Sequence, residues 1–190
     1  LGIVGYGSIG REVGRIGRAF GMRVLALRRS AERAEQGYSV PGTGDPQGAI
    51  PERFYRPEAL HQMLSECDYV VVALPSTPAT RHIIGEAELR AMKPTAFVVN
   101  IARGAIVDEG ALIRALQEGW IAGAGLDVFE QEPLADDSPL WEMENVLLTP
   151  HIAGFTPRYD ERATVLFAEN LHRYLSDQPL LNLVDKSRGY

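Results

Sequence analysis

The sequence has 190 residues, of which 45% are hydrophobic and 23% charged, a balance typical of a globular protein with one well-buried core. Its net charge of −6 argues against nucleic acid or an anionic membrane as a partner, because both require a positive surface. No apolar run is long enough to cross a membrane. The single cysteine, Cys67, excludes an internal disulfide and fits a reducing compartment such as the cytoplasm, and we expect it in the core.

Short apolar runs alternate with helical patterns along the chain. Strands are predicted at residues 1–4, 22–27, 68–74, 95–101, 120–128 and 145–149, and helices at residues 8–20, 56–66, 85–92, 108–118 and 156–175. The first helix carries Ile9, Val13, Ile16 and Phe20 on one face, and residues 37–53, rich in glycine and proline, are expected to form a loop. This alternation predicts an α/β fold with a doubly wound parallel sheet. Because Leu1 already lies in a strand, we expect the chain to be a piece of a longer protein.

The sequence GYGSIG at residues 5–10 matches the G-x-G-x-x-G pattern between a strand and a helix. Gly5 would make the tight turn, Gly7 would let a diphosphate approach the backbone, and Gly10 would let the helix pack close to the strand. The unpaired N–H groups around Ser8 and Ile9 would then face the anionic ligand. Glycine-rich turns also join strands to helices without a ligand, but this context favours dinucleotide binding.

Arginines follow the second predicted strand. Cofactor turns that bind NAD usually have an acid about twenty residues downstream, whereas this chain has Arg28, Arg29 and Ser30, and its first acid is Glu32. Two guanidinium groups and a hydroxyl suit the 2′-phosphate of NADP. We therefore favour NADP over NAD, although a solvated arginine pair would explain the same residues.

Three polar segments come directly after predicted strands, at residues 100–104, 127–133 and 150–154. In an open parallel sheet the loops at the carboxyl ends of the strands form the ligand crevice. Separately, Arg103, Glu132 and His151 could be ordinary surface residues. Together they bring an arginine, an acid and a histidine to one edge of the sheet, which favours a functional site. No metal site is expected.

Through GYGSIG, VNIARG at residues 99–104, residues 127–133 and LTPHIAG at residues 148–154, the chain resembles the cofactor-binding domain of the D-isomer-specific 2-hydroxyacid dehydrogenase family. The resemblance implies that Arg103, Glu132 and His151 are catalytic and that Asp127 contacts the nicotinamide end of the cofactor. With the glycine turn and the arginines, the expected cofactor contacts in the loops are Leu74, Pro75, Thr80, Ile101, Ala102, Arg103, Asp127, His151, Ala153 and Gly154.

The implied reaction reduces a 2-keto acid with a hydride from the nicotinamide. His151 would supply the proton, Glu132 would orient its ring and favour its protonated form, and Arg103 would hold the substrate. Glyoxylate or hydroxypyruvate is the expected substrate, and formate is not, because that branch of the family has glutamine in place of Glu132. Alternatives are an NAD-dependent phosphoglycerate- or D-lactate-type dehydrogenase and a non-catalytic dinucleotide-sensing regulator.

The resemblance also predicts a homodimer and a second, substrate-binding domain. Residues 1–178 are predicted to form the dinucleotide-binding domain, and residues 179–190 to begin the return to the substrate domain. Because half of the substrate cleft would then be missing, we expect little or no turnover from residues 1–190 alone.

Overall fold

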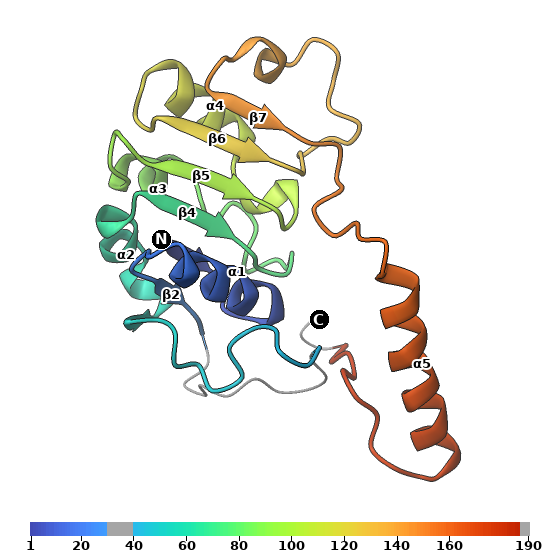
Figure 1. Cartoon of the computed structure of the whole chain (residues 1–190). Helices are drawn as coiled ribbons and strands as arrows, with labels where there is room; N and C mark the ends of the chain where they lie inside the picture. The colour runs from blue at the N-terminus through green and yellow to red at the C-terminus, as the bar shows by residue number, and fades with distance from the viewer. Residues whose placement is uncertain (30–39, 187–190) are drawn as a thin grey trace.

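The computed structural model describes residues 1–29 and 40–186. Its centre is a seven-stranded sheet in the order β3-β2-β1-β4-β5-β6-β7, in which every neighbouring pair is parallel (Figure 1). The strands are β1 (Gly2–Val4), β2 (Leu25–Leu27), β3 (Arg53–Tyr55), β4 (Tyr69–Val72), β5 (Phe97–Asn100), β6 (Gly123–Leu126) and β7 (Val146–Leu148). The order reverses between β1 and β4, which confirms the predicted doubly wound α/β fold.

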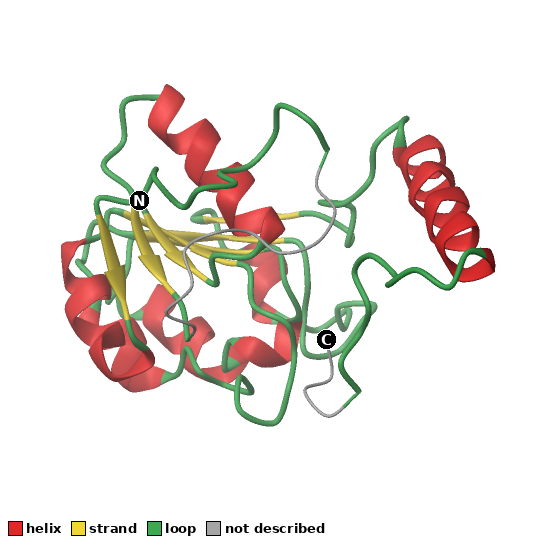
Figure 2. Cartoon of the chain, turned by 90° about the horizontal axis from the view of Figure 1, so that it is seen from below, coloured by secondary structure: helices red, strands yellow, loops and turns green. Residues whose placement is uncertain are grey.

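Helices lie on both faces of the sheet (Figure 2). The first helix, α1, covers one face beside β1, and α2, α3 and α4 cover the other, where the larger hydrophobic core forms. The helices are α1 (Ser8–Ala19), α2 (Leu60–Glu66), α3 (Glu86–Ala91), α4 (Glu109–Gln117) and α5 (Tyr159–Leu175). Strands that are covered on both faces read as continuous apolar runs, and the fully buried Ile3 and Val4 of β1 are an example.

Cys67 lies in the larger core, as predicted. Its side chain is fully buried, and Sγ donates to the carbonyl oxygen of Met63 at 3.1 Å. Burial raises the pKa of this thiol to about 11, because a thiolate would lose its hydration there. Cys67 is therefore a packing residue and not a nucleophile.

The side of α1 that packs on the sheet is made of glycines. Gly10, Gly14 and Gly17 are buried, whereas Ile9 and Phe20 of the predicted apolar stripe are 60% and 78% exposed. Residues without side chains allow the helix axis to approach β1 closely, and this contact decides which side faces inward. The apolar periodicity of residues 8–20 therefore identifies the helix but does not identify its packing face.

The edge strand β3 was not predicted. Residues 37–53 were expected to form a loop and residues 56–66 one helix, but Arg53–Tyr55 pairs with β2, and a 3₁₀ helix (Pro57–Ala59) precedes α2. A three-residue strand with an exposed arginine at its start is too short to show periodicity. Its formation depends on the free edge of β2, which is a tertiary effect.

The last helix, α5, lies apart from the sheet in both views (Figures 1 and 2), and none of its residues is buried. Exposed apolar side chains line it, among them Val165, Phe167 and Leu171. Within the described residues, no helix is both long and apolar enough to span a bilayer. The domain boundary predicted at residue 178 stays a prediction.

Candidate cofactor and catalytic site

The glycine turn leaves open space in front of α1. Gly5 has φ +105°, a conformation that L side chains rarely adopt, so the tight turn requires glycine. At Gly7, an added Cβ would meet no atom within 4 Å, and no side chain caps the helix that begins at Ser8. The N–H groups of the first helical turn lack intrahelical partners, and the first turn carries no acid. This combination fits the diphosphate of a dinucleotide.

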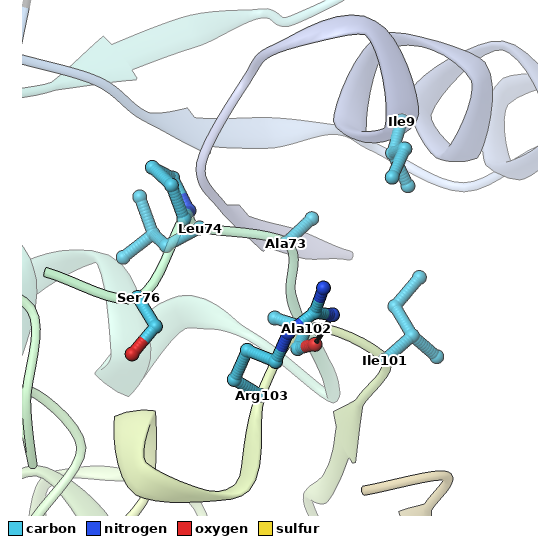
Figure 3. A pocket seen from close by; sticks show the side chains of 8 residues that line it. Ile9, Ala73, Leu74, Ser76, Ile101, Ala102 and Arg103 are labelled. Carbon is cyan, nitrogen blue, oxygen red and sulfur yellow. Dashed lines mark hydrogen bonds between the residues drawn. The ribbon is translucent and has the colours of Figure 1, made fainter. Parts of the chain in front are cut away.

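A pocket of about 420 Å³ lies between α1 and the loops after β4 and β5 (Figure 3). It is lined by Ile9, Ala73, Leu74, Pro75, Ser76, Ile101, Ala102 and Arg103. Most of these residues were predicted from the sequence as cofactor contacts, and Ala73 and Ser76 were not. The signal for Ser76 was its position in the loop after β4, the edge where ligands bind in such sheets.

Thr80, which was also predicted to contact the cofactor, makes hydrogen bonds within its own loop. Its hydroxyl accepts from the backbone N–H of Thr77 at 2.8 Å and donates to the carbonyl oxygen of Pro75 at 2.7 Å. The side chain therefore shapes the loop that carries Pro75 and Ser76 to the pocket. It does not line the pocket itself, and a direct contact with the cofactor stays a prediction.

The turn that carries Arg103 is fixed by Asn100, which is 1% exposed. The amide of Asn100 donates to the carbonyl oxygen of Arg103 at 3.0 Å and accepts from the N–H of Ala102 at 3.1 Å. Next to Arg103, a Cβ on Gly104 would collide with the backbone of Phe129 and Glu130. The absence of a side chain at Gly104 thus brings the arginine turn against the loop that carries Glu132.

His151 and Glu132 are in direct contact, with Nδ1 of the imidazole 2.8 Å from Oε2 of the carboxylate. The other oxygen of Glu132 accepts from the N–H of Phe129 at 3.1 Å. The hydrogen bond from His151 is the main cause that lowers the pKa of Glu132; burial opposes it, and the nearby charge of Arg103 adds to it. Glu132 is therefore ionised near neutral pH, and the structure brings the arginine, the acid and the histidine together.

Asp127 anchors the turn that carries His151. Its carboxylate accepts from the hydroxyl of Thr149 at 2.6 Å and from the N–H groups of Ile152 and Ala153 at 2.8 and 2.9 Å. Burial disfavours the charge of Asp127, but these hydrogen bonds together outweigh it and lower its pKa. His151 itself has φ +55°, a backbone conformation uncommon outside glycine.

Asp127 thus holds the turn, and its predicted contact with the nicotinamide stays a prediction. The same turn contains Ala153, whose N–H is bound to Asp127, and Gly154, beside which a Cβ would meet no atom within 4 Å. Their predicted contacts with the cofactor likewise stay predictions.

Arg28 and Arg29 follow β2 at the same carboxyl edge. The guanidinium of Arg28 lies over the ring of Phe54, 3.8 Å from its centroid, and Arg56 donates to the carbonyl oxygen of Arg29 at 2.6 Å. Ser30, the third predicted 2′-phosphate contact, lies outside the described residues. Neither Phe54 nor Arg56 was identified from sequence, because both belong to the unpredicted β3 and its end. Among residues 1–29 and 40–186, no group of three or more His, Cys, Asp or Glu side chains could hold a metal ion.

A glycine turn at the reversal point of a doubly wound sheet defines the dinucleotide-binding class of domains. Within that class the chain belongs to the D-isomer specific 2-hydroxyacid dehydrogenase family, whose NAD binding domain matches residues 1–153. A glyoxylate reductase of Aeropyrum pernix is 46% identical over 98% of this chain, and one of Thermococcus gammatolerans is 44% identical over 98%. The chain spans about half the length of these curated relatives, 51% in both cases.

Solved structures agree with this assignment. A D-isomer specific 2-hydroxyacid dehydrogenase from Xanthobacter autotrophicus, in complex with NADPH and MES, superposes with a TM-score of 0.84 at 37% identity, covering 100% of this chain and 72% of that one. An NADPH-dependent glyoxylate/hydroxypyruvate reductase from Sinorhizobium meliloti, in complex with NADP and sulfate, gives a TM-score of 0.82 at 32% identity, covering 100% and 56%. The family expected from the sequence motifs is thereby confirmed.

Proposed function

We propose that this chain is the cofactor-binding half of an NADP(H)-preferring reductase of small 2-keto acids of the glyoxylate or hydroxypyruvate type. The observation that carries the proposal is the contact of 2.8 Å between Nδ1 of His151 and Oε2 of Glu132 at the carboxyl edge of the sheet. Relatives named glyoxylate reductase support the substrate class. A homodimer, a cytoplasmic location and a second domain that completes the substrate cleft are part of the same proposal.

His151 is the proton donor in this proposal. With Nδ1 bound to an ionised carboxylate, Nε2 is the ring nitrogen that can deliver a proton to the carbonyl oxygen of a keto acid and take it back in the oxidative direction. Glu132 holds the ring through Nδ1, so that Nε2 can face the substrate. A bound reduced nicotinamide supplies the hydride.

Arg103 binds the substrate. Arg103 lines the pocket beside Ile101 and Ala102, one of its guanidinium nitrogens donates to the carbonyl oxygen of Ala102, and its charge helps to lower the pKa of Glu132. A guanidinium can hold a carboxylate through two parallel hydrogen bonds, which orients a 2-keto acid and polarises its carbonyl group. Binding of the acid by the arginine and protonation by the histidine are then separate tasks on one edge of the sheet.

The preference for NADP(H) rests on Arg28 and Arg29 after β2. Two guanidinium groups at the end of this strand suit a 2′-phosphate, and neighbouring structures of this family in complex with NADPH or NADP support that assignment. The open space at Gly7 and the uncapped start of α1 suit the diphosphate.

The proposal is tested by steady-state turnover of the full-length enzyme with glyoxylate, hydroxypyruvate, pyruvate and phosphohydroxypyruvate, each with NADPH and with NADH. We expect the highest kcat/KM for glyoxylate or hydroxypyruvate with NADPH. Higher kcat/KM for pyruvate or phosphohydroxypyruvate with NADH would instead identify an NAD-dependent dehydrogenase of the same family. Tight NADPH binding without turnover of any acid would favour the non-catalytic dinucleotide sensor.

A further inference from the structure

The guanidinium of Arg28 is held by an aromatic ring of the neighbouring strand. Its Cζ lies 3.8 Å from the centroid of Phe54, and the backbone N–H of Arg28 donates to the carbonyl oxygen of Tyr55 at 3.1 Å. A cation at this distance from a ring face is attracted by the ring quadrupole, and a planar guanidinium also stacks well on it. The strand β3 therefore fixes both the main chain and the side chain of Arg28.

The ring of Phe54 is fixed in turn by the glycine turn. It makes an edge-to-face contact with Tyr6, with ring centroids 5.5 Å apart and an interplanar angle of 78°. Tyr6, the residue between Gly5 and Gly7, is 5% exposed, and its hydroxyl donates to Oδ2 of Asp45 at 2.8 Å. The stack from Tyr6 through Phe54 to Arg28 thus connects the turn for the diphosphate to the cation that would meet the 2′-phosphate.

The second arginine is fixed from the same strand end. Arg56 follows β3 as Arg28 follows β2, and it donates to the carbonyl oxygen of Arg29 at 2.6 Å. Phe54 therefore acts on the side chain of Arg28, and Arg56 acts on the main chain of Arg29. Phe54 lies in β3 and Arg56 directly after it, so both contacts come from the edge strand or its end. Among the described residues, the strand that β3 pairs with is β2.

We propose that Phe54 is a positioning residue for the discrimination of NADP(H) from NAD(H), holding the guanidinium of Arg28 where the 2′-phosphate arrives. This inference rests on the proposed cofactor role of Arg28. Arginine has one of the largest side-chain entropies, and a ring that restricts it beforehand reduces the entropy lost when a phosphate binds. NADH has no 2′-phosphate, so it gains nothing from this restriction, and only the affinity for NADPH depends on the ring.

The test measures dissociation constants of NADPH and NADH by fluorescence titration of the 190-residue chain and its variants. Phe54→Leu and Phe54→Met keep an apolar side chain but remove the ring. Each is expected to raise the dissociation constant of NADPH by about 3- to 10-fold and that of NADH by less than about twofold. Phe54→Tyr keeps an aromatic ring at this position and should therefore keep the affinity for NADPH.

Phe97→Leu is the matched control. Phe97 is also a partly exposed aromatic residue of a strand, in β5, and it stacks on Tyr69 at 5.7 Å rather than on an arginine. This variant should leave the ratio of the two dissociation constants unchanged.

The outcomes separate this inference from the cofactor assignment. Equal weakening of NADPH and NADH in Phe54→Leu would show that Phe54 only supports the fold, and unchanged NADPH affinity would show that the ring does not act on Arg28 at all. Either result would overturn the proposed positioning role of Phe54, while the preference of the unaltered chain for NADPH over NADH would still stand. An unaltered chain that binds both cofactors equally well would instead overturn the NADP assignment.

Discussion

Nδ1 of His151 lies 2.8 Å from Oε2 of Glu132, although the two residues are 19 positions apart in the chain. The carboxylate also accepts from the N–H of Phe129, so its orientation is fixed independently of the histidine. Because an ionised carboxylate only accepts hydrogen bonds, Nδ1 is the donor, which leaves Nε2 as the ring nitrogen for the proposed proton transfer. We therefore expect the loss of His151 to have the largest effect on kcat.

Replacement of His151 by alanine should lower kcat of the full-length enzyme by about 10²–10⁴-fold, the usual contribution of a positioned general acid–base group. The proton would then come from water, while NADPH binding by the glycine turn should be little affected. His172→Ala, which removes an exposed histidine of α5, is the control and should keep its activity. A rate for His151→Ala equal to that of the control would remove His151 from the mechanism.

Much of the fold was readable from the sequence, because strands covered on both faces leave continuous apolar runs. The strand containing Val70 and Val72 and the helix capped by Asp108 were predicted from such local signals, and both are present. The short strand β3 was not, since its three residues form a strand only because the edge of β2 is available. The exposure of Ile9 was not predicted either, because α1 packs on the sheet through its glycines and not through its apolar side chains.

The residues of the candidate site were likewise predicted only in part. Arg103, Glu132 and His151 were predicted because each follows a strand, and parallel strands end at one edge of the sheet. The groups that hold them were missed: the amide of Asn100 and the close approach at Gly104 depend on contacts between loops far apart in the sequence. Sequence patterns therefore predicted the residues expected to meet ligands and the acid beside His151, but not the contacts of Asn100 and Gly104 that position the arginine turn.

Replacement of Arg28 by aspartate should change the preference for the cofactor. A carboxylate would repel the 2′-phosphate and could accept from the ribose hydroxyls, so NADPH affinity should fall by about 10- to 100-fold while NADH affinity holds or rises. Dissociation constants of both cofactors for the 190-residue chain measure this. Arg18→Asp, the same charge change in the last turn of α1, is the control. An unmoved ratio in Arg28→Asp would mean that Arg28 does not contact the 2′-phosphate.

Replacement of Gly104 by alanine should destabilise the fold at the site. The added Cβ would collide with the backbone of Phe129 and Glu130, so one of the two loops must move. Overpacking of this kind costs about 1–3 kcal/mol, and the free energy of unfolding in urea should fall by that amount. In the full-length enzyme, kcat should fall as well, since the arginine turn would move away from Glu132.

The control for this variant is Gly110→Ala in α4. An added Cβ there meets only the carboxylate of Asp108 at 3.5 Å, an ordinary contact, and alanine is the better helix former. This variant should be neutral or slightly stabilising. If Gly104→Ala were equally stable, the close approach of the two loops would not exist in solution.

The stability of the chain should depend on pH through Asp45, which is 5% exposed. Burial opposes its charge, but hydrogen bonds from Ile50, Ala49 and Tyr6 together outweigh burial, so its pKa in the folded state lies below the usual 3.8. A carboxyl group whose pKa is lowered by folding stabilises the folded state above its unfolded pKa. That stabilisation is lost as the pH falls through the folded pKa.

Asp45→Asn should therefore lower the free energy of unfolding at pH 7 by about 1–3 kcal/mol, and the difference from the unaltered chain should shrink as the pH falls below about 4. Urea unfolding at pH 7 and at pH 3 measures both values. Asp137→Asn, which removes an exposed carboxylate, should leave the stability at pH 7 within about 0.5 kcal/mol of the unaltered chain. A deficit for Asp45→Asn of the same size at both pH values would show that the loss comes from packing of the side chain and not from its charge.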